Sequence, residues 1–304
     1  MKKIFLLKVL MLMAIGTASA QEFQGMAVYE SKTSMGEFKS RIEGNSQITP
    51  EMQKMIEERM KKMFEKTFIL NFDKNASIYK EEEKLEAPGQ ERAGFRMMSS
   101  MMGGGGTYYK NLKDKTYTVD KEFMGKEFLV KDSLPKLAWK MEGETRQIGG
   151  YNCFKATAVI EAPKTDFRNF RPKNDKKEEK KDGKDVAKIE AEKEKKTNFM
   201  ADIEMPKEIT ITAWYTPEIP VSNGPENYWG LPGLILEAND GKTTILCSKI
   251  VLNPKDKVAI KAPTNGKVVT QKEYDETVIK KMEEMQQMYQ GQGRGDRQMI
   301  RIGG

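Results

Sequence analysis

The stretch YWGLPGLILEAND, residues 228–240, predicts a corner, a buried strand and a hairpin in direct succession. Leu231-Pro232-Gly233-Leu234 fits a type II turn, because proline sets φ at the second position and glycine supplies a positive φ at the third. Leu234-Ile235-Leu236 is fully apolar, which is typical of a strand buried on both faces. Asp240-Gly241 is a favoured hairpin turn. Together with Gly230, the stretch therefore indicates a structural role and not a catalytic site. Replacing Gly233 by alanine should destabilise the fold.

The N-terminus carries an export pattern. Lys2 and Lys3 precede an apolar run over residues 4–15, and Ala18-Ser19-Ala20 is a small-x-small cleavage site. Cleavage after Ala20 predicts a mature chain that starts at Gln21 and is periplasmic or otherwise exported; the alternative is a short cytosolic N-terminal helix. No segment reaches the roughly 20 apolar residues that cross a bilayer, so we expect no transmembrane segment.

Composition argues against several functions. The formal net charge is +7, and losing the three lysines of residues 1–20 leaves +4, without a compact basic patch that would indicate a nucleic-acid partner. The chain has no histidine, which excludes Ser-His-Asp catalysis and histidine-bound zinc. We therefore predict a protein that is not an enzyme and needs no cofactor; an enzyme of unidentified class is the least favoured alternative.

The cysteines leave two alternatives open. Cys153 and Cys247 would close a loop of about 94 residues if they were bonded, which would stabilise an exported protein. Each also lies in a strand-like run, where a free thiol would pack as a small apolar group.

Two amphipathic helices are predicted near the ends of the mature chain. Thr49 is a candidate N-cap and Pro50 a first-turn proline for the first helix, whose apolar residues share one stripe: Met52, Met55, Ile56, Met60, Met63 and Phe64. The second has apolar residues at steps of three and four: Tyr274, Val278, Met282, Met285 and Tyr289.

Most of the remaining sequence predicts short strands with antiparallel neighbours, because no helical periodicity separates them. The strand-like runs are residues 22–31, 67–72, 76–83, 107–112, 115–120, 126–132, 146–160, 208–221, 242–252 and 257–263. Residues 163–199 are densely charged and are expected to be a solvated insert in a single domain spanning 21–290. Residues 291–304 form a glycine-rich tail that we expect to be flexible.

These elements predict a mainly β (α+β) fold: a single strongly curved antiparallel sheet or half-barrel, with the N-terminal and C-terminal helices over its apolar face. A sheet of roughly nine or ten strands is expected to curl. A curled sheet with a partly covered mouth would form an apolar pocket.

Three blocks resemble a known family. GYNCFKA (150–156), AWYTPEIPVSNGP (213–225) and YWGLPGLILE (228–237) are similar to the signature blocks of the GLPGLI family of exported envelope proteins. The resemblance implies an envelope location and a protein without established catalytic residues. The pattern of sheet and helices is also similar, more weakly, to periplasmic lipoprotein-carrier folds.

Two groups of residues are candidates for binding. Trp214, Tyr215, Tyr228 and Trp229 bracket three prolines, and could line a pocket, dock a partner or form a core corner. A second group, Met97, Met98, Met101 and Met102, lies in a glycine-rich loop. Thioethers select Cu(I), but methionines also make adaptable contact surfaces.

The sequence therefore predicts a non-catalytic exported protein that binds an envelope protein or an apolar small molecule or lipid through its sheet. A methionine-based Cu(I)-binding protein is the alternative. Replacing the four loop methionines by leucine would separate the two, because only Cu(I) binding should be lost.

Overall fold

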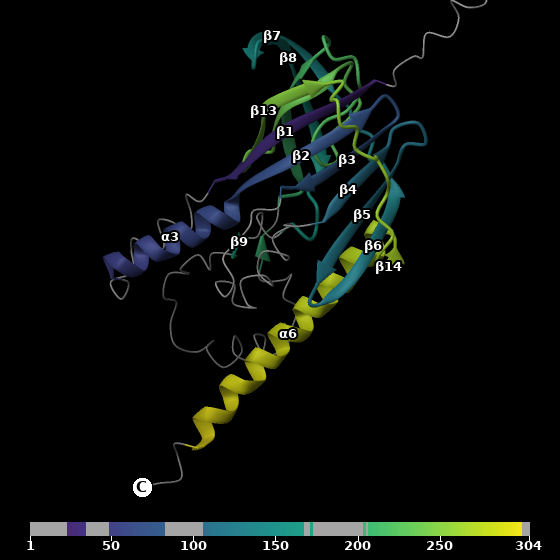
Figure 1. The fold of residues 1–304 in the computed structure, drawn as a ribbon. Coiled ribbons are helices and arrows are strands. Elements are labelled where there is room, and N and C mark those ends of the chain that lie inside the picture. The colour runs from purple at the N-terminus through teal and green to yellow at the C-terminus, as the bar shows by residue number, and fades with distance from the viewer. Residues whose placement is uncertain are drawn as a thin grey trace, which may run out of the picture.

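One large sheet dominates the molecule (Figure 1). The computed structural model describes residues 23–34, 49–82, 106–166, 171–172, 203–204 and 206–299. The sheet strands in chain order are β1 (Gln24–Thr33), β2 (Glu65–Asp73), β3 (Ala76–Glu81), β4 (Thr107–Asn111), β5 (Thr116–Phe123), β6 (Lys126–Ser133), β7 (Lys140–Ile148), β8 (Tyr151–Glu161), β11 (Glu208–Thr216), β12 (Leu234–Asn239), β13 (Thr243–Leu252) and β14 (Lys267–Val269). A separate pair consists of β9 (Arg171–Pro172) and β10 (Ile203–Glu204).

The spatial order of the 12-stranded sheet is β14-β6-β5-β4-β3-β2-β1-β13-β12-β11-β8-β7. Most neighbours are antiparallel, as the short strand spacing predicts, but β14 joins β6 in parallel. The edge strands β14 and β7 do not pair with each other, so the sheet is open and mixed. The prediction of a strongly curved antiparallel sheet or half-barrel is therefore wrong: the sheet is neither closed nor strongly curled.

A long loop covers the sheet instead. Residues 217–233, between β11 and β12, place Ile219, Val221, Tyr228 and Leu231 in one cluster with core residues of the sheet. These sheet residues lie at alternate positions, as half-buried strands require: Ala27, Tyr29, Leu70, Phe72 and Tyr79. A segment of the chain thus fills the face that closure into a barrel would otherwise bury.

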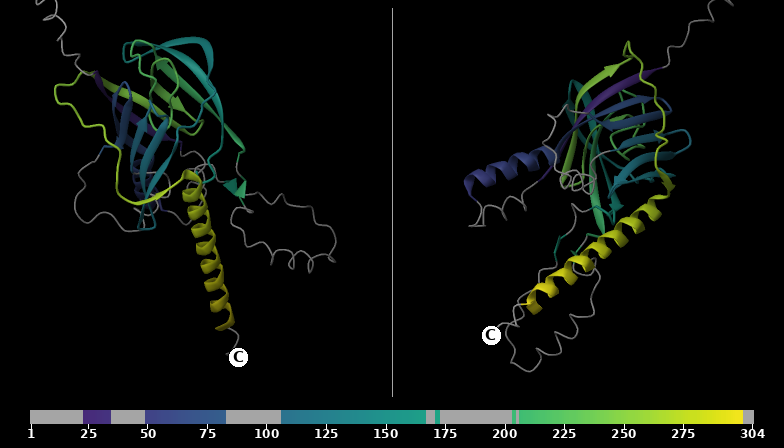
Figure 2. Two further views of the ribbon diagram at one scale, coloured as in Figure 1. Left: turned by 90° about the vertical axis from the view of Figure 1, so that its right-hand side faces the viewer. Right: turned by 60° about the horizontal axis from the view of Figure 1, so that its bottom comes forward.

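The two predicted helices form, but neither lies along the apolar face of the sheet as predicted. Helix α6 (Gln271–Met299) packs Tyr274 and Val278 against the β5–β6 end, where the Tyr274 and Phe128 rings meet edge to face at 5.5 Å. Helix α3 (Pro50–Phe64) leads directly into β2 and projects away from the sheet (Figures 1 and 2). Its Met60 and Met63 are buried, whereas its outer methionines are exposed.

The helix ends follow local rules. The predicted N-cap is confirmed, because Thr49 Oγ1 accepts a hydrogen bond from the Met52 amide at 3.3 Å. A capping box starts α6: the Thr270 amide donates to Glu273 Oε2 at 2.8 Å, and the Glu273 amide donates to Thr270 Oγ1 at 3.2 Å. Helix α6 continues to Met299, so residues 291–299, predicted as part of a flexible tail, are helical.

Two other local predictions have different outcomes. Residues 257–263 form no strand. They belong to the connection that runs from β13 to β14 at the far edge of the sheet, where no neighbouring strand pairs with them (Figure 1). The hairpin is confirmed, but Gly241 and Lys242 are its central residues: the Asp240 amide donates to the Thr243 carbonyl at 3.2 Å, and Gly241 has φ +87°.

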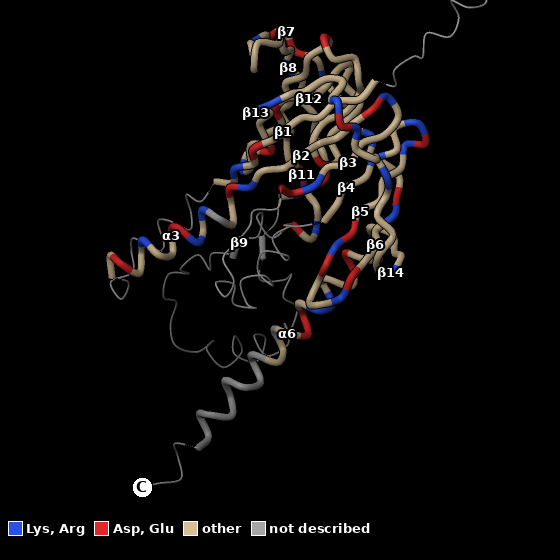
Figure 3. The backbone as a smooth tube through the Cα atoms, in the orientation of Figure 1, with Lys and Arg blue, Asp and Glu red and all other residues tan. Residues whose placement is uncertain are grey.

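Several predicted features lie outside the described residues: the export segment, the loop with Met97, Met98, Met101 and Met102, and most of the charged insert. No described helix is long and apolar enough to cross a membrane. Lysines, arginines and acidic residues are interspersed along α3 and the strand ends (Figure 3).

Candidate functional site

The chain does turn at residues 231–234, but the geometry of the turn differs from the prediction. The Gly233 amide donates to the Leu231 carbonyl at 2.8 Å, which makes a three-residue γ-turn centred on Pro232. Gly233 does not have positive φ; the positive value in this stretch, +95°, belongs to Gly230. The type II assignment is therefore wrong. Glycine is required at 233 because a Cβ there would overlap the Thr216 carbonyl.

The strand after the corner is buried on both faces, as predicted. Leu234, Ile235 and Leu236 are all almost completely buried. Strand β12 pairs with β13 only over Glu237–Asn239, so the Ile235 carbonyl has no strand partner on that side. The Tyr29 hydroxyl takes the place of a strand partner and donates to the Ile235 carbonyl oxygen at 2.7 Å. This bond secures the position where β12 separates from β13.

A fully buried lysine holds the 217–233 loop on the sheet. Lys110 of β4 is 0% exposed, and its Nζ donates to the carbonyl oxygens of Gly224 and, at 3.3 Å, Tyr228. Ser77, the cross-strand partner of Lys110, donates from Oγ to Asn223 Oδ1 at 3.3 Å. The pair therefore contacts both ends of residues 223–228.

Burial lowers the pKa of Lys110 from 10.5 to about 7, and the carboxylate of Glu226 partly opposes this shift. A lysine that titrates near neutrality has the acid–base profile of catalytic lysines. Here both contacts of the amine are backbone carbonyls, and the side chain is closed off from solvent. The arrangement indicates a structural role.

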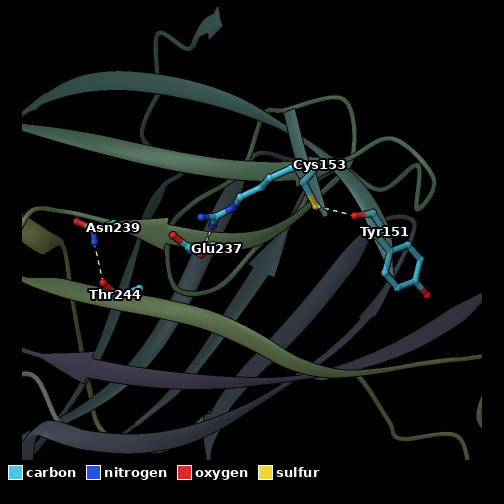
Figure 4. Close-up of polar contacts among 6 residues, drawn as sticks. Tyr151, Cys153, Glu237, Asn239 and Thr244 are labelled. Carbon is cyan, nitrogen blue, oxygen red and sulfur yellow. Dashed lines mark hydrogen bonds and ion pairs between the residues drawn. The ribbon is translucent and has the colours of Figure 1, made fainter. Parts of the chain in front are cut away.

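A polar cluster lies on the face of the sheet that carries Trp214 and Glu237, and Figure 4 shows its contacts at Glu237, Asn239 and Thr244. The Arg146 guanidinium of β7 stacks over the Trp214 ring of β11, 4.1 Å from its centroid, and forms an ion pair with Glu237 of β12. Beside it, Asn239 Nδ2 donates to Thr244 Oγ1 at 2.6 Å. The cluster ties β7, β11, β12 and β13 together through side chains.

A second ion-pair group continues this face. Lys155 of β8 lies 3.0 Å from Glu142 and 2.8 Å from Glu144, both in β7. Thr157 Oγ1 also donates to Glu142, and these hydrogen bonds hold the pKa of the Glu142 carboxyl below its usual value.

The structure does not gather the four predicted aromatic residues into one site. Trp214 lies under Arg146, whereas its neighbour Tyr215 points to the other face, as alternation in a strand requires. Tyr228 is in the core beside Lys110. Trp229 is half-buried, and its Nε1 donates to the Pro135 carbonyl at 2.7 Å.

The two cysteines are both buried and both free. Cys153 Sγ approaches the Tyr151 carbonyl at 3.6 Å (Figure 4), and Cys247 Sγ approaches the Lys249 carbonyl at 3.5 Å. Burial raises the pKa of Cys153 to about 11 and that of Cys247 to about 12. Neither thiol is therefore suited to act as a thiolate nucleophile at neutral pH.

An exposed apolar patch occupies the free edge of the sheet. We call Met141 and Phe154, with the Tyr215 ring behind them, the edge patch. Met141 is 51% and Phe154 38% exposed. The Tyr215 hydroxyl contacts Met141 Sδ at 3.4 Å, and its ring lies 6.1 Å from that of Phe154. Aromatic and methionine side chains are the types enriched in protein interfaces.

A family model without an assigned activity matches this region. A family model described as "Protein of unknown function (Porph_ging)" matches residues 139–237, which include β7, β8, β11, the 217–233 loop and most of β12. The match agrees with the expectation of a family of unknown function, although it does not carry the GLPGLI name. No curated protein matches the chain.

Two solved structures are similar at low level. "Structure of PNGF-II in C2 space group" is 14% identical, covers 84% of this chain and 32% of its own, and has a TM-score of 0.43. "Structure of PNGF-II in P21 space group" is 13% identical, with coverages of 84% and 33% and the same TM-score. This chain therefore spans about a third of the length of those chains. Similarity at this level supports no conclusion about fold or activity.

Sequence reasoning missed Lys110, Arg146 and Phe154. A signal existed for Lys110, because alternation in TYYKNL puts it on the same face as Tyr108, which is a core-facing position. The Arg146–Glu237 pair joins residues 91 positions apart, and no local pattern predicts it.

Proposed function

We propose that the chain is a non-catalytic exported protein that binds a protein partner through the edge patch on β7 and β8. The observation that carries the proposal is the exposure of Met141 and Phe154 at an edge of the sheet where, within the described residues, no further strand pairs.

Partner binding is favoured over an apolar small ligand. The ligand hypothesis depended on a pocket formed by sheet curvature, and the sheet is not strongly curled. The face that would line such a pocket is packed against the 217–233 loop, with Ile219, Val221 and Leu231 each 3% exposed or less.

The N-terminal sequence supports export. A basic start, an apolar run over residues 4–15 and Ala18-Ser19-Ala20 together are the pattern of a secretory leader. Mass spectrometry of the N-terminal peptide of the protein from its native host tests this part. Gln21 at the N-terminus is the expected result, and Met1 would contradict export by cleavage.

Site-specific photo-crosslinking tests the partner. A photoreactive phenylalanine analogue at Phe154 or at Met141 should give a discrete higher-mass adduct in the native host. The matched control is Val268, which is 59% exposed on β14 at the opposite edge of the sheet, and it should give none. Equal adducts from all three positions, or none from the edge patch, would refute this site.

A further inference from the structure

Among the described residues, no strand pairs with the outer backbone of β7. The turn between β7 and β8 is Gly149-Gly150, with φ of +57° and +88°, which closes a two-residue hairpin on the pair Ile148 and Tyr151. In such a hairpin the two residues that close the turn are hydrogen-bonded to each other. The following residue pairs then alternate between non-hydrogen-bonded and hydrogen-bonded. The N–H and C=O groups of Gln147 and Thr145 therefore point away from β8.

The contacts of β8 agree with this assignment. The amide of Asn152, which is opposite Gln147, donates to Glu218 Oε1 at 2.8 Å and not to β7. Within the described part of the chain, β7 has no strand neighbour except β8. The opposite edge of the sheet offers a shorter strand for pairing, because β14 has only three residues and α6 begins directly after it.

A bulge limits the open segment. Met141 pairs with Ala156 and Thr145 with Phe154, so the three residues 142–144 of β7 lie opposite Lys155 alone. Bulges and charges interrupt the pairing of an edge strand. A regular ladder is available only over Thr145–Ile148, which suits a short extended segment better than a long strand.

The charges on this edge are not balanced. Lys155 is shared by Glu142 and Glu144, and Arg146 is paired with Glu237. Lys140 at the start of β7 also acts on Glu142, and Glu218 accepts from the Asn152 amide, so four acidic groups face three basic ones and one negative charge remains in excess. The Glu144 side chain is 62% exposed. On the other face of the same strands, Phe154 and Met141 offer apolar contact.

We infer that the β7 edge binds an extended segment of a partner protein by strand addition, with a basic side chain beside Glu144 and an apolar side chain over Phe154. Main-chain hydrogen bonds to Thr145 and Gln147 provide affinity in this arrangement, and the alternating side chains select the sequence. The inference depends on the proposed function and specifies the chemistry of its partner.

Peptide titration tests the inference. The probes are two short blocked peptides in which valine and threonine alternate around a central lysine or, in the matched peptide, a central glutamate. They are titrated to about 1 mM, the range of weak binding, against the isotope-labelled chain. The lysine peptide should slow hydrogen exchange at the Thr145 and Gln147 amides, and the glutamate peptide should bind several-fold more weakly. Unchanged exchange at both amides, or equal binding of the two peptides, would overturn the inference.

Two variants identify the groups responsible. Gln147→Pro removes an outward N–H and should abolish protection of Thr145, whereas Gln147→Ala retains the N–H and should bind as the parent does. Glu144→Lys should reverse the preference between the two peptides. If Gln147→Pro fails to fold, a lysine peptide N-methylated at alternate residues should lose binding to the parent chain. Retained binding of that peptide would exclude strand addition.

The outcomes separate this inference from the proposed function. Crosslinks from Phe154 without peptide binding would preserve the docking site but refute strand addition, and the absence of both would refute both. Sedimentation of the chain alone should show a monomer. A dimer that Gln147→Pro dissociates would identify a second copy, and not a different protein, as the strand donor and would overturn the inference as stated.

Discussion

At the scale of single residues, Gly233 shows how the same expectation can rest on a different cause. Replacement by alanine should destabilise the fold by about 1–3 kcal/mol, because the new Cβ meets backbone that has little freedom to move. Chemical denaturation measures this loss. Gly143→Ala is the control: a Cβ there has open space, and its free energy of unfolding should change by less than about 0.5 kcal/mol. Equal effects of the two substitutions would refute the close-approach explanation.

Lys110 predicts a specific pH dependence. Its pKa is about 7 in the folded chain and near 10.5 when exposed. Between these values the unfolded chain binds the proton and the folded chain does not, so this group makes the free energy of unfolding rise with pH from about 7 to 10. Lys110→Met removes this contribution. The stability difference between parent and variant should therefore grow in favour of the parent across that window.

Denaturant titrations at several pH values measure this difference. Lys113→Met, at an exposed position in the turn after β4, is the control for the loss of one lysine. The raised pKa values of the two thiols affect parent and variants alike and cancel in the comparison. A parallel pH profile for Lys110→Met would show that the buried amine does not titrate in this range.

At the scale of elements, α3 divides its methionines between two environments. Met60 and Met63 are 8% and 5% exposed, whereas Met52 and Met55 are each 45% exposed. Met60→Ala should cost about 2 kcal/mol or more, because it removes buried apolar volume. Met52→Ala should change stability by less than about 0.5 kcal/mol. Thermal or chemical unfolding of both variants checks this, and a cost at Met52 as large as at Met60 would show that the outer turn of α3 is also packed.

Local rules predicted most elements. Strand alternation located β2 to β6, and the Thr49 cap with Pro50 located the start of α3. The failure at 257–263 has a physical reason: an extended apolar sequence becomes a strand only when a neighbour accepts its hydrogen bonds, and this segment runs where none does. The aromatic residues predicted as one site separate because Trp214 and Tyr215 are adjacent in a strand and must face opposite sides.

At the scale of the whole molecule, the free cysteines give a direct test of the assembled fold. Alkylation in denaturant without reductant should modify both Cys153 and Cys247, and alkylation of the native chain should modify neither, because both are buried. Intact mass reports the number of added groups. An unmodified denatured chain, two hydrogens lighter than the reduced form, would show that the thiols are bonded.

The sequence alone determined most of the elements of this protein: the strands β2 to β6, the start of α3, the hairpin between β12 and β13, and a strand buried on both faces at 234–236. Each depends on contacts or dihedral preferences within a few residues. Tertiary structure alone decided that the sheet stays open, that the 217–233 loop covers it, and that Lys110, Arg146 and the edge patch lie where they do. These features depend on pairings between residues far apart in the chain, such as Lys110 with Gly224 and Arg146 with Glu237, and no local pattern encodes such pairings.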